Sequence, residues 1–240
     1  MANPFTSEAM TQGYAKSRPP VHQQVVKMAL DGRKFSRALD VGCGSGLSTR
    51  ALAGFAENRA GFDPSEMMMR VAGSVDPEAR FWVGQSERLP VRDDSMDLLT
   101  AAGSLNYSDP VAFFREAQRV LKPSGTVLVY DFSPGMHGWF ATFIERYPWP
   151  AGEALELNPA KLRSMAGAPF GMTVAEHFAF GMPLTRDFYI EYMMTESNVA
   201  CAMRSGATGE SVRAWIEETL PEAPEINAEF RGYFCCFVRK

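Results

Sequence analysis

Three glycines alternate with other residues early in the chain, in the stretch LDVGCGSGLSTR at residues 39–50. Gly42, Gly44 and Gly46 have the spacing GxGxG, and Asp40 lies two residues before the first of them. Glycine lets the backbone adopt positive φ and lets a ligand approach it closely. A helix that follows such a loop offers free N–H groups and the positive end of its dipole. The stretch therefore predicts a ligand-binding loop.

Two familiar ligands of such loops are disfavoured here. A phosphate-binding P-loop ends in Gly-Lys-Ser/Thr, whereas Gly46 is followed by Leu-Ser-Thr. A nicotinamide dinucleotide loop has the spacing GxGxxG, and Leu47 stands where its third glycine would be. At this point the residues leave the ligand of the loop open.

A carboxylate follows the next short apolar stretch, RAGFD, which ends at Asp63. Placed at the end of a second strand, this side chain can accept hydrogen bonds from both hydroxyls of a ribose. A plain turn residue at the end of a strand is the alternative. Ligands of an open parallel sheet bind beyond the carboxyl ends of its strands, so polar residues at that edge are candidates for the site. They are Asp40, Asp63, Gln85, Ser104, Asn106, Tyr107 and Asp131.

Proton-transfer candidates are few, and no catalytic residue is assigned. His137 follows the expected fifth strand, and a neutral imidazole is the natural base near pH 7. A structural role for this histidine is the alternative. Tyr107 and Asp131 border the expected pocket and, like His137, are weak candidates. His22, on an expected helix, and His177, on an expected strand, are weaker candidates than His137.

Aromatic residues between Trp139 and Trp149 are spaced as on one face of a helix. We expect them to serve both as core and as an apolar lid that encloses a small organic substrate. Near the N-terminus, Tyr14 and Arg18 are candidates for a lid over the cofactor, with Arg18 meeting a carboxylate. A solvated surface explains these two residues as well.

Strand and helix patterns alternate through the first half of the chain, which favours a parallel sheet covered by helices on both faces. The apolar spacing predicts strands over 37–42, 59–63, 79–85, 96–104, 126–132, 172–180 and 230–240. It predicts helices over 21–30, 46–56, 65–74, 109–121, 185–198 and 210–220, with a turn at 122–125. Asp109 is the expected N-cap of one helix, and Pro64 is expected in the first turn of another.

We expect one domain over residues 1–240. Its core covers about 34–133, 172–183 and 228–240, and its cap or lid segments cover about 1–30, 134–171 and 184–221. The formal net charge of -4 argues against nucleic acid as the main partner. No secretory signal or membrane span is apparent in the sequence. The four cysteines show no CxxC pair, so we expect neither disulfides nor a metal site. We also expect a cytoplasmic location. The oligomeric state is left open.

Four motifs in order, over residues 37–132, resemble the class I methyltransferases. More narrowly, they resemble the group of ubiquinone/menaquinone and trans-aconitate methyltransferases. The motifs are LDVGCGSG, GFDPSEMM, GQSERLPVRDDSMDLL and REAQRVLKPSGTVLVYDF. The resemblance implies S-adenosyl-L-methionine as cofactor. It also implies an α/β, Rossmann-like, seven-stranded, mostly parallel sheet with helices on both faces, an antiparallel last strand and helical cap insertions.

The resemblance also implies which residues bind the cofactor. Gly42 and Gly44 would let the backbone approach its methionine part, and Asp40 would lie near the ammonium group, with bracing of the loop as the alternative. Met67 or Met68 would pack on adenine, with a role in the core equally open. The family often has Asp where this chain has Gln85, which puts that adenine contact in doubt. The expected binding residues are Tyr14, Arg18, Asp40, Gly42, Cys43, Gly44, Asp63, Pro64, Met68, Gln85, Ser86, Glu87 and Ser104.

The sequence therefore predicts a methyltransferase that acts on a small organic molecule. Oxygen of an acid or phenol is the favoured acceptor atom, and carbon is the second. A non-catalytic, cofactor-binding assembly or sensing module is one alternative. Methylation of RNA or protein is another.

Overall fold

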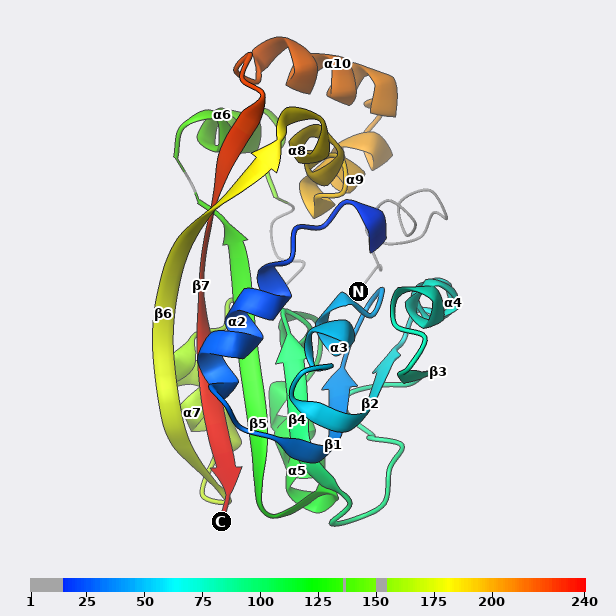
Figure 1. The fold of residues 1–240 in the computed structure, drawn as a ribbon, viewed down its shortest axis with the longest axis vertical. Helices are drawn as coiled ribbons and strands as arrows, with labels where there is room; N and C mark the ends of the chain where they lie inside the picture. The colour runs from blue at the N-terminus through cyan, green and yellow to red at the C-terminus, as the bar shows by residue number, and fades with distance from the viewer. Residues whose placement is uncertain (1–14, 136, 150–154) are drawn as a thin grey trace. The chain divides into compact units, whose positions relative to one another are not determined.

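A seven-stranded sheet with the strand order β3-β2-β1-β4-β5-β7-β6 organises the chain. The structure is a computed structural model, and it describes residues 15–135, 137–149 and 155–240. Figure 1 shows β7 running opposite to its neighbours β5 and β6. The strands are β1 (Phe35–Val41), β2 (Ala56–Asp63), β3 (Arg80–Val83), β4 (Met96–Ala102), β5 (Leu121–Pro134), β6 (Phe170–Thr185) and β7 (Glu225–Arg239).

The first five strands run parallel, with β1 between β2 and β4. In β1, four consecutive residues from Ala38 to Val41 are buried, as expected for a strand covered on both faces. Asp40 lies opposite Gly61 of β2 and Thr100 of β4. The parallel registers bring the carboxyl ends of these strands to one edge of the sheet. The predicted fold class is confirmed.

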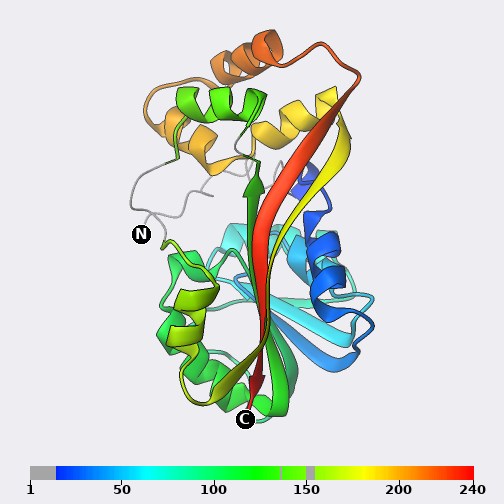
Figure 2. The same ribbon diagram turned by 90° about the vertical axis from the view of Figure 1, so that its left-hand side faces the viewer.

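Two compact units divide the chain. The sheet unit contains residues 20–132, 154–177 and 232–240, and the helical unit takes its described residues from 1–19, 133–153 and 178–231. Helices lie on both faces of the sheet unit, with α5 and α7 on one side and α2 on the other (Figure 2). Its helices are α2 (Val21–Leu30), α3 (Leu47–Ala51), α4 (Glu66–Val75), α5 (Pro110–Val120) and α7 (Pro159–Ala166), with a 3₁₀ turn, η1 (Leu105–Tyr107).

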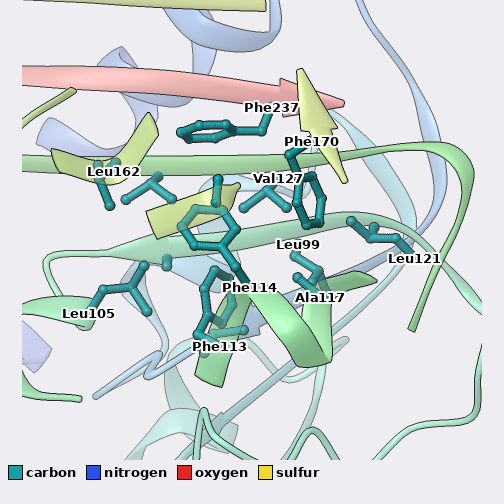
Figure 3. Packing of buried hydrophobic residues seen from close by; sticks show 14 of the residues in the cluster. Leu99, Leu105, Phe113, Phe114, Ala117, Leu121, Val127, Leu162, Phe170 and Phe237 are labelled. Carbon is teal, nitrogen blue, oxygen red and sulfur yellow. The ribbon is translucent and has the colours of Figure 1, made fainter. Parts of the chain in front are cut away.

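Helix α5 anchors the core of the sheet unit. It begins after Asp109, whose carboxylate accepts hydrogen bonds from the N–H groups of Val111 and Ala112, so the predicted N-cap is confirmed. The Phe114 ring packs edge-on against the rings of Phe170 and Phe237, with centroids 5.5 and 5.2 Å away (Figure 3). The core thus connects α5 to strands distant in sequence.

The helical unit contains α6 (Trp139–Arg146), α8 (Arg186–Met193), α9 (Ser197–Arg204) and α10 (Gly209–Thr219). Aromatic rings form much of its interior. Trp139 of α6 is stacked on Phe143 and contacts Tyr189 of α8 and Trp215 of α10. The predicted helical spacing is confirmed for Trp139, Phe140 and Phe143, whereas Tyr147 and Trp149 lie beyond the end of α6. Whether they also enclose a substrate stays a prediction.

Several predicted element boundaries were wrong. The helix expected over 46–56 is the five-residue α3, and β2 already begins at Ala56. Pro64 precedes α4 rather than entering its first turn, because the Ser65 hydroxyl caps that helix. The expected turn at 122–125 lies within β5, where the pairing with β4 shifts its register.

Further differences lie in the second half of the chain. The helix expected over 185–198 ends at Met193, and α9 and α7 were not predicted. Strands β6 and β7 are longer than predicted. The single-domain organisation with cap segments stays a prediction. Among the described residues, no helix is long and apolar enough to span a membrane.

Truncating Phe114 tests the core. Phe114→Ala removes a ring that is 2% exposed, so we expect the free energy of unfolding to fall by about 3–5 kcal/mol in chemical denaturation. Val111→Ala on the same helix is the control, because Val111 is 48% exposed and should change stability by less than about 0.5 kcal/mol. Equal losses for the two variants would contradict this description of the core.

Candidate functional site

A buried carboxylate braces the base of the glycine loop. Asp40 is fully buried at the end of β1 and accepts three hydrogen bonds from hydroxyl groups. Ser48 and Thr49 of α3 donate to Oδ2 at 2.6 and 2.8 Å, and Thr100 of β4 donates to Oδ1 at 2.7 Å. Burial raises the pKa of Asp40, and the three hydroxyl donors oppose that shift. The structure thus shows Asp40 bracing the loop, the alternative that the sequence left open.

Gly42 is enclosed by protein. Its φ is +67°, and a Cβ built on it would lie 2.4 Å from Cβ of Ser104. The Ser104 hydroxyl donates to the carbonyl of Val41 at 2.6 Å. Ser104, just beyond β4, therefore packs against the start of the loop, and no side chain fits at position 42.

Gly44 differs from Gly42 because its outer side is open. Its φ is +51°, and a Cβ built on it would meet no atom within 4 Å. Its N–H donates to Oδ2 of Asp63 at 3.1 Å, while Oδ1 accepts from the N–H of Ser65 at 2.9 Å. The loop after β1 is thus joined to the end of β2 by a carboxylate.

Asp63 keeps acceptor capacity for a ligand. A carboxylate offers about four acceptor positions, and the two backbone N–H groups occupy only part of them. Burial raises the pKa of Asp63, and the two backbone hydrogen bonds oppose that shift. The arrangement suits a ligand that brings hydroxyl donors, such as a ribose.

The other residues of this edge that are predicted to bind the cofactor lie in the glycine loop or after the carboxyl ends of β2 and β3. Cys43 is 5% exposed, its N–H donates to the carbonyl of Phe62, and burial raises its thiol pKa far above the ordinary value. Pro64 is exposed, whereas Met68 is only 2% exposed, on the buried side of α4. The Met68 side chain therefore belongs to the core, and partly buried Met67 is the more accessible of the two.

Gln85, Ser86 and Glu87 form the turn after β3, which an isolated bridge between Gln85 and Arg88 closes. Gln85 and Glu87 are exposed and Ser86 is partly buried. The Glu87 carboxylate accepts a hydrogen bond from the N–H of Asp109 at 3.0 Å. Glu87 thus connects this turn to the start of α5, and the contacts of all three with a cofactor stay predictions.

A second polar group joins the segment after β4 to the last residues of β5. Asn106 donates through Nδ2 to Oδ2 of Asp131 at 2.7 Å, and the N–H of Phe132 donates to Oδ1 at 2.8 Å. Burial raises the pKa of Asp131, and these donors oppose that shift. Tyr107, the other weak candidate here, is 48% exposed.

Three predicted residues do not belong to the described part of the sheet unit. Arg18, in the helical unit, is ion-paired with Glu196 at 2.8 Å and donates to the carbonyl of Thr195. His137, also in the helical unit, lies with Nε2 3.2 Å from Oε2 of Glu229, and its side chain is 55% exposed. Tyr14 lies outside the described residues. Their roles toward cofactor or substrate stay predictions.

Sequence reasoning missed the hydroxyls that hold Asp40. Thr100 could not be paired with Asp40 before the register of β1 and β4 was known. Ser48 and Thr49 gave only a weak signal for partners of Asp40, because they are polar residues at positions of α3 that are buried. All four cysteines are free, and no metal-binding group of His, Cys, Asp and Glu occurs in the part of the chain that the structure describes.

Comparisons with known proteins agree with this geometry. A methyltransferase domain family matches residues 39–129, from the glycine loop into β5. The chain carries a class I, S-adenosylmethionine-dependent methyltransferase domain. The predicted family, enzyme class and cofactor are thereby confirmed.

Individual relatives show how far the similarity extends. The demethylmenaquinone methyltransferase of Streptomyces griseus is 28% identical over 160 residues, which are 65% of this chain and 68% of the relative. The uncharacterized methyltransferase YcgJ of Bacillus subtilis is 36% identical over 105 residues, 41% of this chain and 42% of that protein. The crystal structure of YcgJ superposes with a TM-score of 0.58 and 20% identity, covering 92% of this chain and 98% of the other. The last comparison bears on the fold alone.

The residues present suit S-adenosylmethionine. The open side of Gly44 leaves space for a ligand against the backbone, and the neighbouring Asp63 retains acceptor positions for hydroxyl donors. Gly44 and Asp63 are hydrogen-bonded to each other, so one ligand can contact both. Bound S-adenosylmethionine would supply an electrophilic methyl group on sulfur.

The two glycines should respond differently to alanine. Gly42→Ala should lower the free energy of unfolding by at least about 2 kcal/mol, because the new methyl group overlaps Ser104 and φ is positive. Gly44→Ala should cost only about 1 kcal/mol of stability but weaken S-adenosylhomocysteine binding at least about tenfold in calorimetry.

Gly32→Ala is the matched control for Gly44→Ala. Gly32 has φ +71° and also meets nothing within 4 Å of a built Cβ, but it precedes β1. Its alanine variant should lose similar stability and keep full affinity for S-adenosylhomocysteine. Normal binding by a folded Gly44→Ala protein would argue against the loop as the ligand contact.

Proposed function

We propose that this protein transfers the methyl group of S-adenosylmethionine to a small organic molecule. Oxygen of an acid or phenol is the favoured acceptor atom, and carbon is the second. The main support is the joined pair of Gly44 and Asp63, with an open side for a cofactor. The ribose of the cofactor would bind Asp63, and its methionine part would bind the loop.

Other contacts with the cofactor follow from their places along the same edge. Gln85, Ser86 and Glu87 would read the adenine, with partly buried Met67 beside it. Ser104 would lie near the sulfonium, because it packs against Gly42. Asp40 would act through the loop, since its three hydroxyl bonds hold the loop's base.

Charge and relatives favour a small acceptor. The chain has a formal net charge of -4, which does not suit a phosphate backbone. The Streptomyces relative is named for demethylmenaquinone, a small organic molecule. In four of the curated relatives, the matched segments span between 42% and 68% of each relative's length. Because the similarity covers only part of each relative, the acceptor of this chain is a proposal and is not taken from a relative's name.

Positioning can account for much of the rate. A sulfonium methyl group is already reactive, and holding two reactants in line can supply about 7–11 kcal/mol of a barrier. An acid needs no base, whereas a phenol needs its proton removed. His137, Tyr107 and Asp131 remain the candidates, and among them Asp131 is held within the sheet unit by Asn106.

The acceptor class is tested with methyl-labelled S-adenosylmethionine. Purified protein is offered organic acids, phenols and quinones, and in parallel total RNA and a protein extract. We expect label in small molecules. Label confined to RNA or protein would contradict the proposal, and cofactor binding without transfer to any class would favour the non-catalytic module.

Asp63 variants test the ribose site. Asp63→Ala should weaken S-adenosylhomocysteine binding by about 1–3 kcal/mol in calorimetry, the range for hydrogen bonds to a charged acceptor. Asp63→Asn keeps one acceptor oxygen and should lose less. Unchanged affinity in the alanine variant would remove Asp63 from the site.

Affinity should also fall in acid. Hydroxyl donors favour the ionised carboxylate, so binding weakens as pH falls through the pKa of Asp63, which burial places above 3.8. Calorimetry across this range, on protein verified as folded at each pH, should show the loss in the wild type. Asp63→Asn should lack this component, and identical profiles would contradict the assignment.

A further inference from the structure

Tyr233 of β7 holds a buried hydroxyl that has no hydrogen-bond partner among the described residues. The whole residue is only 9% exposed. A buried hydroxyl without a partner lowers folding stability, so such groups are rare in folded proteins. The Tyr233 ring lies edge-on to the His177 ring, with centroids 6.3 Å apart, a contact that a phenylalanine ring would also make.

Tyr233 faces the same side of the sheet as Asp131. Val127 and Val129 of β5 share one core cluster with Tyr233, Cys235 and Phe237 of β7. Side chains alternate along a strand, so Asp131, two residues after Val129, points to this side as well. Burial, and next the negative charge of Asp131, raise the pKa of Tyr233. The N–H of Gly135 donates to the carbonyl of Glu229, and this antiparallel register of β5 and β7 places Asp131 opposite Tyr233, so the two groups are neighbours.

Asp131 lies beside Gly103 and Ser104, the segment after β4 that packs against the glycine loop. A Cβ built on Gly103 would lie 3.0 Å from Oδ1 of Asp131, and the next residue, Ser104, packs against Gly42. Asn106 holds Oδ2 of Asp131, and the carbonyl of Asn106 accepts a hydrogen bond from Leu155. All of these residues belong to the sheet unit, as the loop does.

We propose that Asp131, Asn106 and Tyr233 bind the acceptor molecule and select a neutral hydroxyl group. This inference rests on the proposed function and narrows its substrate class to phenols or alcohols. The acceptor hydroxyl donates to the Asp131 carboxylate and accepts from the Tyr233 hydroxyl. Asp131 and Asn106 are partly exposed, so the acceptor approaches Tyr233 from their side.

The donor and acceptor pattern gives the selectivity. A hydroxyl group both donates and accepts, so it satisfies Asp131 and Tyr233 together. A carboxylate only accepts hydrogen bonds, and the charge of Asp131 repels it. An ammonium group only donates, and it leaves the Tyr233 proton without an acceptor on the ligand. Tyr233 is therefore a binding residue for the acceptor and contributes nothing to cofactor affinity.

Thermal unfolding without ligand tests whether the Tyr233 hydroxyl serves binding or structure. Tyr233→Phe removes an unpaired group, so Tm should stay unchanged or rise. Tyr130→Phe is the matched control on β5, because its hydroxyl is hydrogen-bonded to His22 Nδ1 at 2.9 Å. The control should lower Tm by about 2–4 °C. An equal loss in Tyr233→Phe would show a structural hydroxyl and overturn the proposal.

Matched aromatic acceptors test the selectivity. Benzyl alcohol, benzoate and benzylamine form one set, and 2-naphthol, 2-naphthoate and 2-naphthylmethylamine form a larger one. With labelled S-adenosylmethionine, the hydroxyl member should take the label. Its KM should rise about five- to tenfold in Tyr233→Phe, while the Kd of S-adenosylhomocysteine stays constant.

Each other outcome has a definite meaning. Label on the carboxylate or amine members alone, an unchanged KM in Tyr233→Phe, or no label on either hydroxyl member overturns the acceptor site. If wild-type protein binds S-adenosylhomocysteine, those results leave the proposed cofactor site standing. If a folded wild type does not bind it, the proposed function fails as well.

Discussion

The buried carboxylate of Asp40 is the constraint on which the rest of the site depends. It joins three elements, because its hydrogen-bond donors come from α3 and β4 while it stands at the end of β1. Without those donors, a fully buried charge would be costly. With these donors in place, the loop after β1 is held in one conformation. In that conformation the N–H of Gly44 donates to the carboxylate of Asp63. The hydrogen bonds of Asp40 thus hold the loop in the conformation that leaves the outer side of Gly44 open.

Neighbouring glycines in the loop do different work. Gly42 is glycine because Ser104 fills the space where a Cβ would lie. Gly44 faces open space, so its positive φ rather than a neighbouring side chain favours glycine there, and we propose that its open side contacts the ligand. A spacing pattern such as GxGxG cannot separate the two cases, since both residues have positive φ.

Three carboxylates of this edge share one electrostatic property. Burial raises the pKa of Asp40, Asp63 and Asp131 above their unfolded values. Each therefore favours the folded state most below the unfolded pKa, and this contribution is lost as pH rises through the folded pKa. At neutral pH these ionised groups cost stability. Residues retained at such a cost are expected at functional sites.

Local patterns in the sequence predicted the parallel strands in the first half of the chain, the cap at Asp109 and the loop between β1 and α3. They failed where distant segments decide the structure. Helix α3 stops after five residues although its sequence continues with apolar residues, because β2 begins at Ala56 and pairs with Phe35. The partners of Asp40 and the lone hydroxyl of Tyr233 depend on which strands become neighbours. Alternation places Tyr233 inward, but nothing local shows that it lacks a partner.

The central claim is that the loop from Gly42 to Gly46, tied to Asp63, holds S-adenosylmethionine. Calorimetric titration of the wild-type protein with S-adenosylhomocysteine, run beside NAD, tests this most directly. We predict one-to-one binding of S-adenosylhomocysteine at micromolar concentration and none of NAD. A folded, ligand-free protein that binds neither, or that binds NAD as tightly, would contradict the claim.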